Sequence, residues 1–281
     1  MKLFTEKIAV APGIALEARR YEGGAKTPVL CLPGLTRNAR DFENVAPFIA
    51  DLGRDVVVLS LRGRGGSDRD PDYLHYVPTT YVDDVLCVME ALGLSSAVFL
   101  GTSLGGIVSM LINQAASDRV AAAVINDVGP ALAPEGLARI ADYAGETRRA
   151  ANLDEAAAQT RAINEIAFPN RDDAFWRAFA ARTCREGEDG WIPDYDPAIG
   201  KALVEAGPAP NLWPAFESLK AKPTLVIHGA LSDLLTPPII ERMRAANPNI
   251  RICDVANTGH APTLSEPEAR MAIEAFLAPL G

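Results

Sequence analysis

The apolar positions along the chain fall into short continuous runs that predict strands buried on both faces. Six runs of strand length occur at residues 27–32, 55–61, 97–101, 120–127, 223–229 and 250–255. Because apolar residues in these runs are continuous rather than alternating, they are typical of a parallel sheet covered by helices on both sides. Ahead of the first run, residues 5–21 predict an opening hairpin that turns at Pro12 and Gly13.

Longer amphipathic segments between these runs predict helices. Residues 79–94 begin at two threonines that can cap a helix and end near Gly93, and a last helix is predicted within "EPEARMAIEAFLAPL". Strands that alternate with helices indicate the α/β class, with a mostly parallel twisted sheet flanked by helices.

The alternation stops between residues 131 and 215, where the pattern is helical and contains no strand run. We therefore predict a core made of residues 1–130 and 216–281. Residues 131–215 are predicted to form a helical cap, inserted after the sixth strand and lying over the sheet.

The predicted cap contains all three tryptophans of the chain, Trp176, Trp191 and Trp213. Ligand pockets are mostly lined by apolar and aromatic side chains. We therefore predict that these tryptophans contribute to a substrate pocket beneath the cap, and that the substrate is moderately apolar.

Composition narrows the class of protein. The 281 residues carry a formal net charge of −9, which argues against binding to nucleic acid or to an anionic membrane surface. No apolar run approaches the length of a membrane span, and the N-terminus lacks the pattern of a signal peptide. The four cysteines are widely separated, so we predict neither a disulfide framework nor a metal site, and expect a cytoplasmic protein.

One motif carries candidate chemistry. Residues 101–105, "GTSLG", match G-x-S-x-G, with a strand run before them and the helical pattern "GGIVSMLINQAA" after them. In this arrangement a serine lies at a tight strand-to-helix turn, and the glycines are needed because a β-carbon there would collide with the neighbouring element. The motif predicts that Ser103 is a nucleophile.

A serine hydroxyl needs a base to accept its proton, and the chain has only three histidines. His260 follows the strand run at 250–255 in a loop, and a loop at a strand end can reach the serine, so we predict that His260 is the base. His228 ends a strand run and His75 lies in a polar loop, and neither is favoured.

An acidic residue is expected to orient the histidine. We favour Asp233, which lies in the loop after the strand run at 223–229, because the order Ser103, Asp233, His260 matches that of hydrolases built on such a sheet. The alternative is Asp127, at the end of the run at 120–127.

Acyl transfer also needs backbone donors for the oxyanion. We predict the amide of Leu104, the residue after the nucleophile, and the amide of Leu35 in the loop "PGLTRN" that follows the first strand run. The glycine-rich stretch at 61–70 lacks the spacing of a phosphate-binding loop and is interpreted as a strand-end turn with salt-bridged arginines.

Taken together, the motifs resemble those of the α/β-hydrolase superfamily over nearly the whole chain. They are "PGL", "LRGRGGS", "GTSLGG", "HGALSD" and "NTGHAPTLSEP". The resemblance is greatest to small capped esterases and to hydrolases similar to 3-oxoadipate enol-lactonase. Many relatives have His-Gly where this chain has Pro33-Gly34, so a hydrogen bond from that histidine is absent here.

The resemblance implies a serine hydrolase that cleaves a small carboxylic ester or lactone through an acyl-enzyme, with no cofactor. Haloalkane dehalogenases and epoxide hydrolases resemble this chain but use an aspartate at the position of Ser103, so the serine argues against those two activities. Two alternatives stay open, which are hydrolysis of a carbon–carbon bond in ring-cleavage diketones and a ligand receptor on the same fold.

Overall fold

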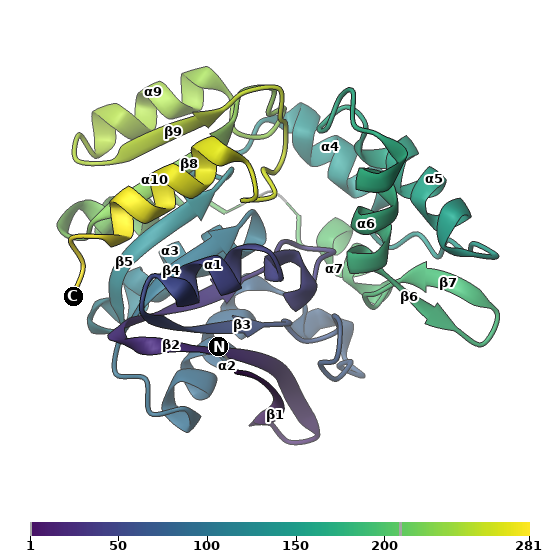
Figure 1. The fold of residues 1–281 in the computed structure, drawn as a ribbon, viewed down its shortest axis with the longest axis horizontal. Coiled ribbons are helices and arrows are strands. Elements are labelled where there is room, and N and C mark those ends of the chain that lie inside the picture. Colours follow the sequence, from purple (N-terminus) through teal and green to yellow (C-terminus); the bar gives the residue numbers. More distant parts are fainter. Residues whose placement is uncertain (1, 208–209) are drawn as a thin grey trace.

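The computed structural model describes residues 2–207 and 210–281, and it confirms the predicted α/β architecture (Figure 1). A seven-stranded sheet forms the centre of the molecule. Its strands are β1 (Leu3–Ala11), β2 (Ile14–Leu32), β3 (Arg54–Leu59), β4 (Ala97–Thr102), β5 (Val120–Asn126), β8 (Thr224–Gly229) and β9 (Arg251–Val255). Strands β2, β4, β5, β8 and β9 pair in that order and in parallel, while β1 runs antiparallel to β2.

The first part of the sheet differs from the predicted one. The second hairpin strand and the run at 27–32 are one continuous strand, β2, rather than two. Val56 of β3 partners both Tyr21 and Val29, so β3 lies between the two arms of a bent β2. The insertion therefore follows the fifth strand in chain order, β5, and not the sixth.

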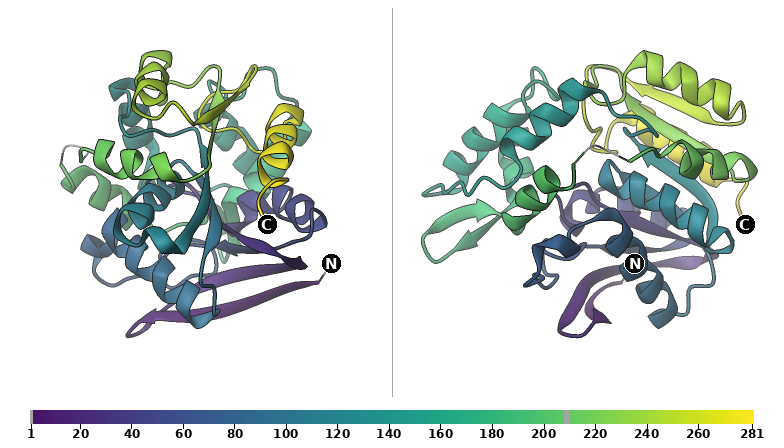
Figure 2. Two further views of the ribbon diagram at one scale, coloured as in Figure 1. Left: turned by 90° about the vertical axis from the view of Figure 1, so that its left-hand side faces the viewer. Right: turned by 180° about the vertical axis from the view of Figure 1, so that it is seen from behind.

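Helices cover both faces of the sheet, as the continuous apolar runs predicted (Figure 2). Buried side chains of α1 and α10 pack on one face, and those of α2, α3, α8 and α9 pack on the other. Their bounds are α1 (Val45–Asp51), α2 (Pro78–Ala91), α3 (Leu104–Ala115), α8 (Trp213–Ser218), α9 (Pro237–Ala246) and α10 (Pro267–Leu277). Strands β4, β5 and β8 have fully or almost fully buried runs because apolar side chains leave both of their faces.

Between β5 and β8 the chain leaves the sheet and forms a lobe, seen at the right of Figure 1. Its elements are α4 (Pro134–Tyr143), α5 (Leu153–Asn164), α6 (Asp173–Thr183), β6 (Cys184–Gly187), β7 (Gly190–Pro193) and α7 (Ala198–Glu205). The prediction of a segment without strands is wrong, because β6 and β7 form a short hairpin. Its two strands are joined by the two residues Glu188 and Asp189, a connection of the length most common in hairpins. The last predicted cap residues, from Trp213 onward, begin α8 and pack against α3 of the core.

No helix within residues 2–207 and 210–281 is long and apolar enough to cross a membrane.

Candidate active site

Ser103 lies at the turn between β4 and α3 with a backbone φ of 53° and ψ of −115°. Residues other than glycine rarely adopt this backbone conformation, and here the surrounding hydrogen bonds maintain it. The Ser103 amide donates to the carbonyl of Asn126 at 2.9 Å, and the Ser103 carbonyl accepts from the amide of Gly106 at 2.9 Å. The turn thus fixes the serine above the end of β4.

The glycines around Ser103 allow close approach of β4, α3 and β2. A β-carbon on Gly101 would overlap the carbonyl of Gly105, and a β-carbon on Gly105 would overlap the carbonyl of Leu32. A β-carbon on Gly106 would lie 2.5 Å from the Val128 side chain. The predicted steric role of the motif's glycines is confirmed by these contacts.

Replacing Gly105 with alanine is expected to lower the free energy of unfolding by at least about 1–3 kcal/mol, because the methyl group must push α3 away from β2. Thermal unfolding measures the effect. Gly34→Ala is the matched control, since a β-carbon at Gly34 meets no atom closer than 3.5 Å. Equal losses of stability in the two variants would contradict the steric explanation.

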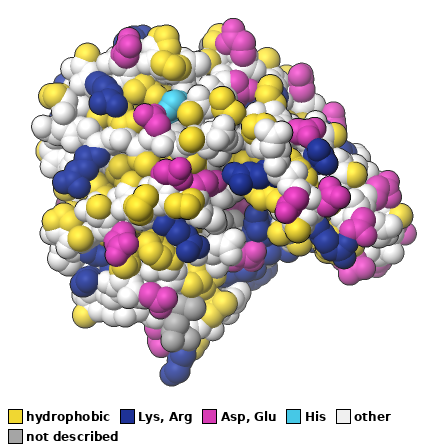
Figure 3. Space-filling view, turned by 45° about the horizontal axis from the view of Figure 1, so that its top comes forward, with side chains coloured by type: hydrophobic (Ala, Val, Ile, Leu, Met, Phe, Trp, Pro, Cys, Tyr) yellow, Lys and Arg dark blue, Asp and Glu magenta, His cyan; other side chains and the backbone are white. Residues whose placement is uncertain are grey.

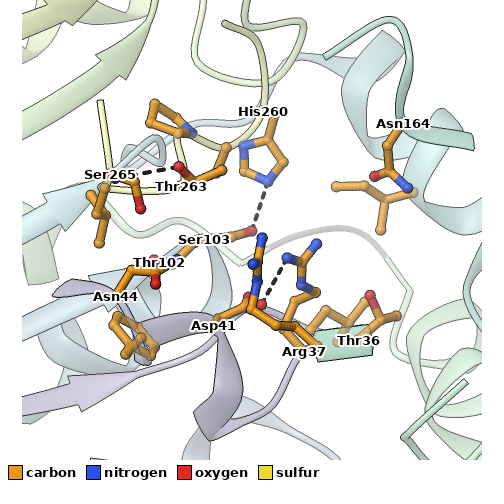
Figure 4. A pocket seen from close by; sticks show the side chains of 18 of the residues that line it. Thr36, Arg37, Asp41, Asn44, Thr102, Ser103, Asn164, His260, Thr263 and Ser265 are labelled. Carbon is orange, nitrogen blue, oxygen red and sulfur yellow. Dashed lines mark hydrogen bonds and ion pairs between the residues drawn. The ribbon is translucent and has the colours of Figure 1, made fainter. Parts of the chain in front are cut away.

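His260 lies in the loop between β9 and α10 and points at the serine (Figure 4). Its Nε2 atom is 2.9 Å from Ser103 Oγ, and its Nδ1 atom is 2.8 Å from Asp127 Oδ2. In the tautomer that lets Nε2 accept the serine proton, Nδ1–H donates to the Asp127 carboxylate. The predicted proximity of Ser103 and His260 is therefore present in the fold.

Asp127 follows β5 directly and is completely buried. One of its oxygens accepts from the Gly229 amide at 2.8 Å, and the other accepts from the Ser232 hydroxyl at 2.7 Å as well as from His260. Donors on three sides hold the carboxylate in place and compensate for its burial. The end of β8 and the loop after it, which were expected to supply the acidic partner of His260, instead supply the donors that hold Asp127.

Asp233, the residue favoured from the sequence, forms no hydrogen bond or ion pair with His260 in the part of the chain that the structure describes. Both of its oxygens accept from the guanidinium of Arg139, a residue of α4. Burial acts to raise the pKa of Asp233, but the hydrogen-bonded Arg139 outweighs this and holds the pKa below its ordinary value. The assignment of Asp233 as the partner of His260 is corrected to Asp127, since Arg139 occupies Asp233 and the Asp127 side chain is the one aimed at the imidazole.

The two residues predicted to supply the oxyanion donors both lie close to the serine. Leu104 is the first residue of α3, and Leu35 lies in the loop after β2 and lines the same cavity as Ser103. The carbonyl of Leu35 accepts a hydrogen bond from the buried Arg64. Arg64 also donates to the Tyr81 hydroxyl, so it ties the loop to the core.

The predicted salt bridges of the glycine-rich turn at 61–70 are present for one of its arginines, Arg62, but among the described residues not for Arg64. Arg62 forms buried ion pairs with Asp70 and Asp84. Arg64 instead supports the Leu35 loop, a contact that has no signal in the sequence because the two residues are 29 positions apart.

A cavity opens in front of Ser103 and His260, between the strand ends and the lobe. The core contributes Gly34, Leu35 and Thr102 to its lining, and the lobe contributes Ile140, Tyr143, Asn164 and Arg182. Many of the lining residues are polar, including Arg37 and Asp41, which lie beneath Ser103 in Figure 4.

The three tryptophans are not among the residues that line this cavity, so their predicted role is wrong. Trp176 is buried with Phe168 and Phe179 in the core of the lobe, and Trp191 packs against the same cluster. Trp213 packs edge-on against Phe216 on the core. A small lobe needs its own apolar interior, and the aromatic side chains supply it.

Comparison with known proteins agrees with this architecture and with the resemblance seen in the sequence. A 3-hydroxybutyrate-oligomer hydrolase of Cupriavidus necator is 34% identical over 255 residues, covering 87% of this chain and 86% of its own length. Esterase YbfF of Escherichia coli is 27% identical over 258 residues, covering 86% of this chain and 89% of its own length.

The fold is also similar to that of solved structures. An alpha/beta hydrolase from Novosphingobium aromaticivorans has a TM-score of 0.92 and 39% sequence identity, with 98% of both chains covered. The model of the alpha/beta hydrolase family matches residues 29–275. Given this match and a 34% identical relative of similar length, the chain belongs to the alpha/beta hydrolase family.

Proposed function

We propose that the chain is a carboxylic ester hydrolase that works through an acyl-enzyme on Ser103. The observation that carries the proposal is the hydrogen-bonded series from Ser103 Oγ to His260 at 2.9 Å and from His260 to Asp127 at 2.8 Å. A serine in contact with a base, and a base oriented by a buried carboxylate, is the arrangement that activates a hydroxyl for attack on an acyl carbon.

The proposed reaction has two halves. Ser103 Oγ attacks the ester carbonyl while His260 Nε2 accepts its proton, and His260 then donates that proton to the departing alcohol. In the second half His260 takes a proton from water as the water oxygen attacks the acyl carbon. His260 then returns this proton to Ser103 Oγ as the bond between that oxygen and the acyl carbon breaks, which releases the acid and the free serine. Asp127 stays ionised and stabilises the imidazolium that forms in both halves.

The negative oxygen that forms during each attack needs donors. We propose the backbone amides of Leu104 and Leu35 for this role. The position of Leu104 at the first turn of α3 supports the proposal, because a helix N-terminus favours negative charge. The Arg64 contact supports it for Leu35, because that contact fixes the peptide that follows Leu35.

For the substrate we propose a short ester of the 3-hydroxybutyrate type, with a lactone as the second form of the same bond. The name of the 34% identical Cupriavidus necator protein supports this class. The polar lining of the cavity also fits it better than a long alkyl chain, since lining by apolar side chains is what an alkyl chain would need.

Hydrolysis of 4-nitrophenyl acetate, butyrate and octanoate, and of a linear 3-hydroxybutyrate dimer, tests the proposal. We expect turnover of the short esters and of the dimer, with octanoate the poorest substrate. Cleavage of a ring-cleavage diketone without cleavage of any ester would favour carbon–carbon hydrolysis. Tight binding of an ester without turnover would favour a receptor.

A further inference from the structure

Two arginines from separate parts of the chain lie in the cavity with the nucleophile. Arg37 follows β2, and Arg182 lies in the last turn of α6 in the lobe. Both line the cavity that contains Ser103, and both guanidinium groups lie against the ring of Phe179, at 4.3 and 5.8 Å from its centre. The fold therefore brings two positive charges to the same part of the cavity.

These arginines have more donors than the surrounding protein uses. Arg37 donates to Asp41 at 2.8 Å, but its buried Nε atom has no partner among the described residues. Within residues 2–207 and 210–281 the Arg182 guanidinium donates no hydrogen bond, and its ion pair with the exposed carboxylate of Glu43 is long, at 3.8 Å. Donors without partners in a largely buried guanidinium are costly unless a ligand or water satisfies them.

The charge of this part of the cavity is also incompletely balanced. Burial lowers the pKa of Arg182, and the neighbouring Arg37 lowers it further, while Asp41 and Glu43 oppose this effect. Glu43 is substantially exposed, so solvent weakens its contribution. Two guanidinium groups face one closely hydrogen-bonded carboxylate, that of Asp41, and one exposed and more distant carboxylate, that of Glu43. Their positive charge is therefore only partly compensated inside the cavity, which suits an anionic group.

The attraction for an anion at this place is local. The chain as a whole carries a net charge of −9, and acidic and basic side chains are mixed over the face shown in Figure 3. Attraction of an anion to the region of Ser103 must therefore come from the arginines of the cavity and not from the overall charge of the protein.

We propose that the substrate carries a free carboxylate, which Arg182 and Arg37 bind inside the cavity while Ser103 attacks the ester a few atoms away. The inference rests on the proposed ester hydrolysis at Ser103 and adds the charge of the substrate to it. A planar carboxylate matches the parallel donors of a guanidinium and can satisfy those that the protein leaves unused.

Two pairs of esters test the inference, and in each pair one member has a carboxylate where the other has an uncharged methyl or amide group. One pair is mono-4-nitrophenyl adipate and 4-nitrophenyl hexanoate, with the carboxylate on the acyl side. The other is 3-acetoxybutyrate and 3-acetoxybutanamide, with the carboxylate on the alcohol side. We expect the wild type to prefer the charged member at least tenfold in kcat/KM in one pair. A ratio at or below one in both pairs would overturn the inference.

Arg182→Gln removes the charge and most of the donors. The ratio of kcat/KM for the charged and uncharged esters is expected to fall about 10- to 100-fold, mainly through a higher KM for the charged ester. Arg182→Lys, which keeps the charge but not the fork of donors, should give an intermediate ratio. An unchanged ratio in Arg182→Gln would contradict the proposed contact.

Arg161→Gln is the matched control, since Arg161 is an exposed arginine of α5 that pairs with Glu165 and does not line the cavity. The loss of one surface charge there should leave the ratio unchanged. An equal fall in both variants would mean that overall charge, and not the cavity, selects the substrate.

Calorimetry separates failure of the inference from failure of the proposed activity. If no ester is turned over, the ester hydrolase proposal fails, but binding of 3-hydroxybutyrate and 3-hydroxybutanamide can still be compared. Preference for the acid, weakened about tenfold or more in Arg182→Gln, would support the anion site by itself. Absence of that preference would overturn it.

Discussion

Replacing Ser103 with alanine is expected to lower kcat about 10⁶-fold on any ester that the wild type hydrolyses. The change removes the oxygen that we propose forms the acyl-enzyme, which lies 2.9 Å from His260 Nε2. Steady-state hydrolysis of 4-nitrophenyl butyrate measures the loss.

Ser265→Ala is a suitable comparison, because Ser265 lines the same cavity. Its loss should stay below tenfold. His260→Ala should cost about as much as Ser103→Ala, and the double variant should cost little more, since the two side chains act as one unit. A residual rate within tenfold of the wild type in Ser103→Ala would refute the assignment of the nucleophile.

Replacing Asp127 with asparagine is expected to lower kcat about 10⁴-fold. If the new amide group faces His260 Nδ1, the imidazole must accept there, and Nε2 then carries the hydrogen and is unable to take the proton of Ser103. The loss should therefore appear in kcat rather than in stability alone, which circular dichroism and thermal unfolding can check.

Asp233→Asn is the matched variant, because it makes the same chemical change in the acid favoured from the sequence. Asp233 is held by Arg139 from the lobe, so its replacement should cost less than tenfold in kcat while loosening the contact between α4 and the loop after β8. A larger loss in Asp233→Asn than in Asp127→Asn would return the role of the acid to Asp233.

Much of the site is encoded locally. Ser103 lies between Gly101 and Gly105, with a strand before it and a helix after it. This pattern of a few residues is enough to predict the tight turn that presents the serine. His260 can be predicted because the chain has only three histidines, and His260 is the one in a loop that closely follows a strand, five residues after β9.

The choice between the two candidate acids could not be made from local pattern, because both follow parallel strands at the same edge of the sheet. What decides between them is which carboxylate the fold aims at His260: Asp127 is held 2.8 Å from the imidazole, and Asp233 is held by Arg139. Arg139 and Asp233 are 94 residues apart in sequence, and the Ser232 hydroxyl that holds Asp127 is 105 residues from it.

The arginines were missed for a related reason. Arg37 and Arg182 are unremarkable charged residues in the sequence. Arg182 lies three residues after Phe179 on α6, and only the position of α6 beside the loop after β2 brings Arg37 to the same ring. The tryptophans were predicted to line the pocket but do not, because an aromatic-rich segment can form either a pocket wall or the interior of a lobe, and only the packing distinguishes the two.

The sequence by itself therefore determined the class of fold, the strand-to-helix turn that presents Ser103, and the loop that carries His260. These depend on apolar periodicity and on backbone geometry within a few residues. The tertiary structure decided that Asp127, and not Asp233, lies at hydrogen-bond distance from His260, that aromatic side chains fill the lobe, and that two arginines line the cavity. Each of these depends on which distant side chains are paired, and pairing is set by packing across the whole molecule.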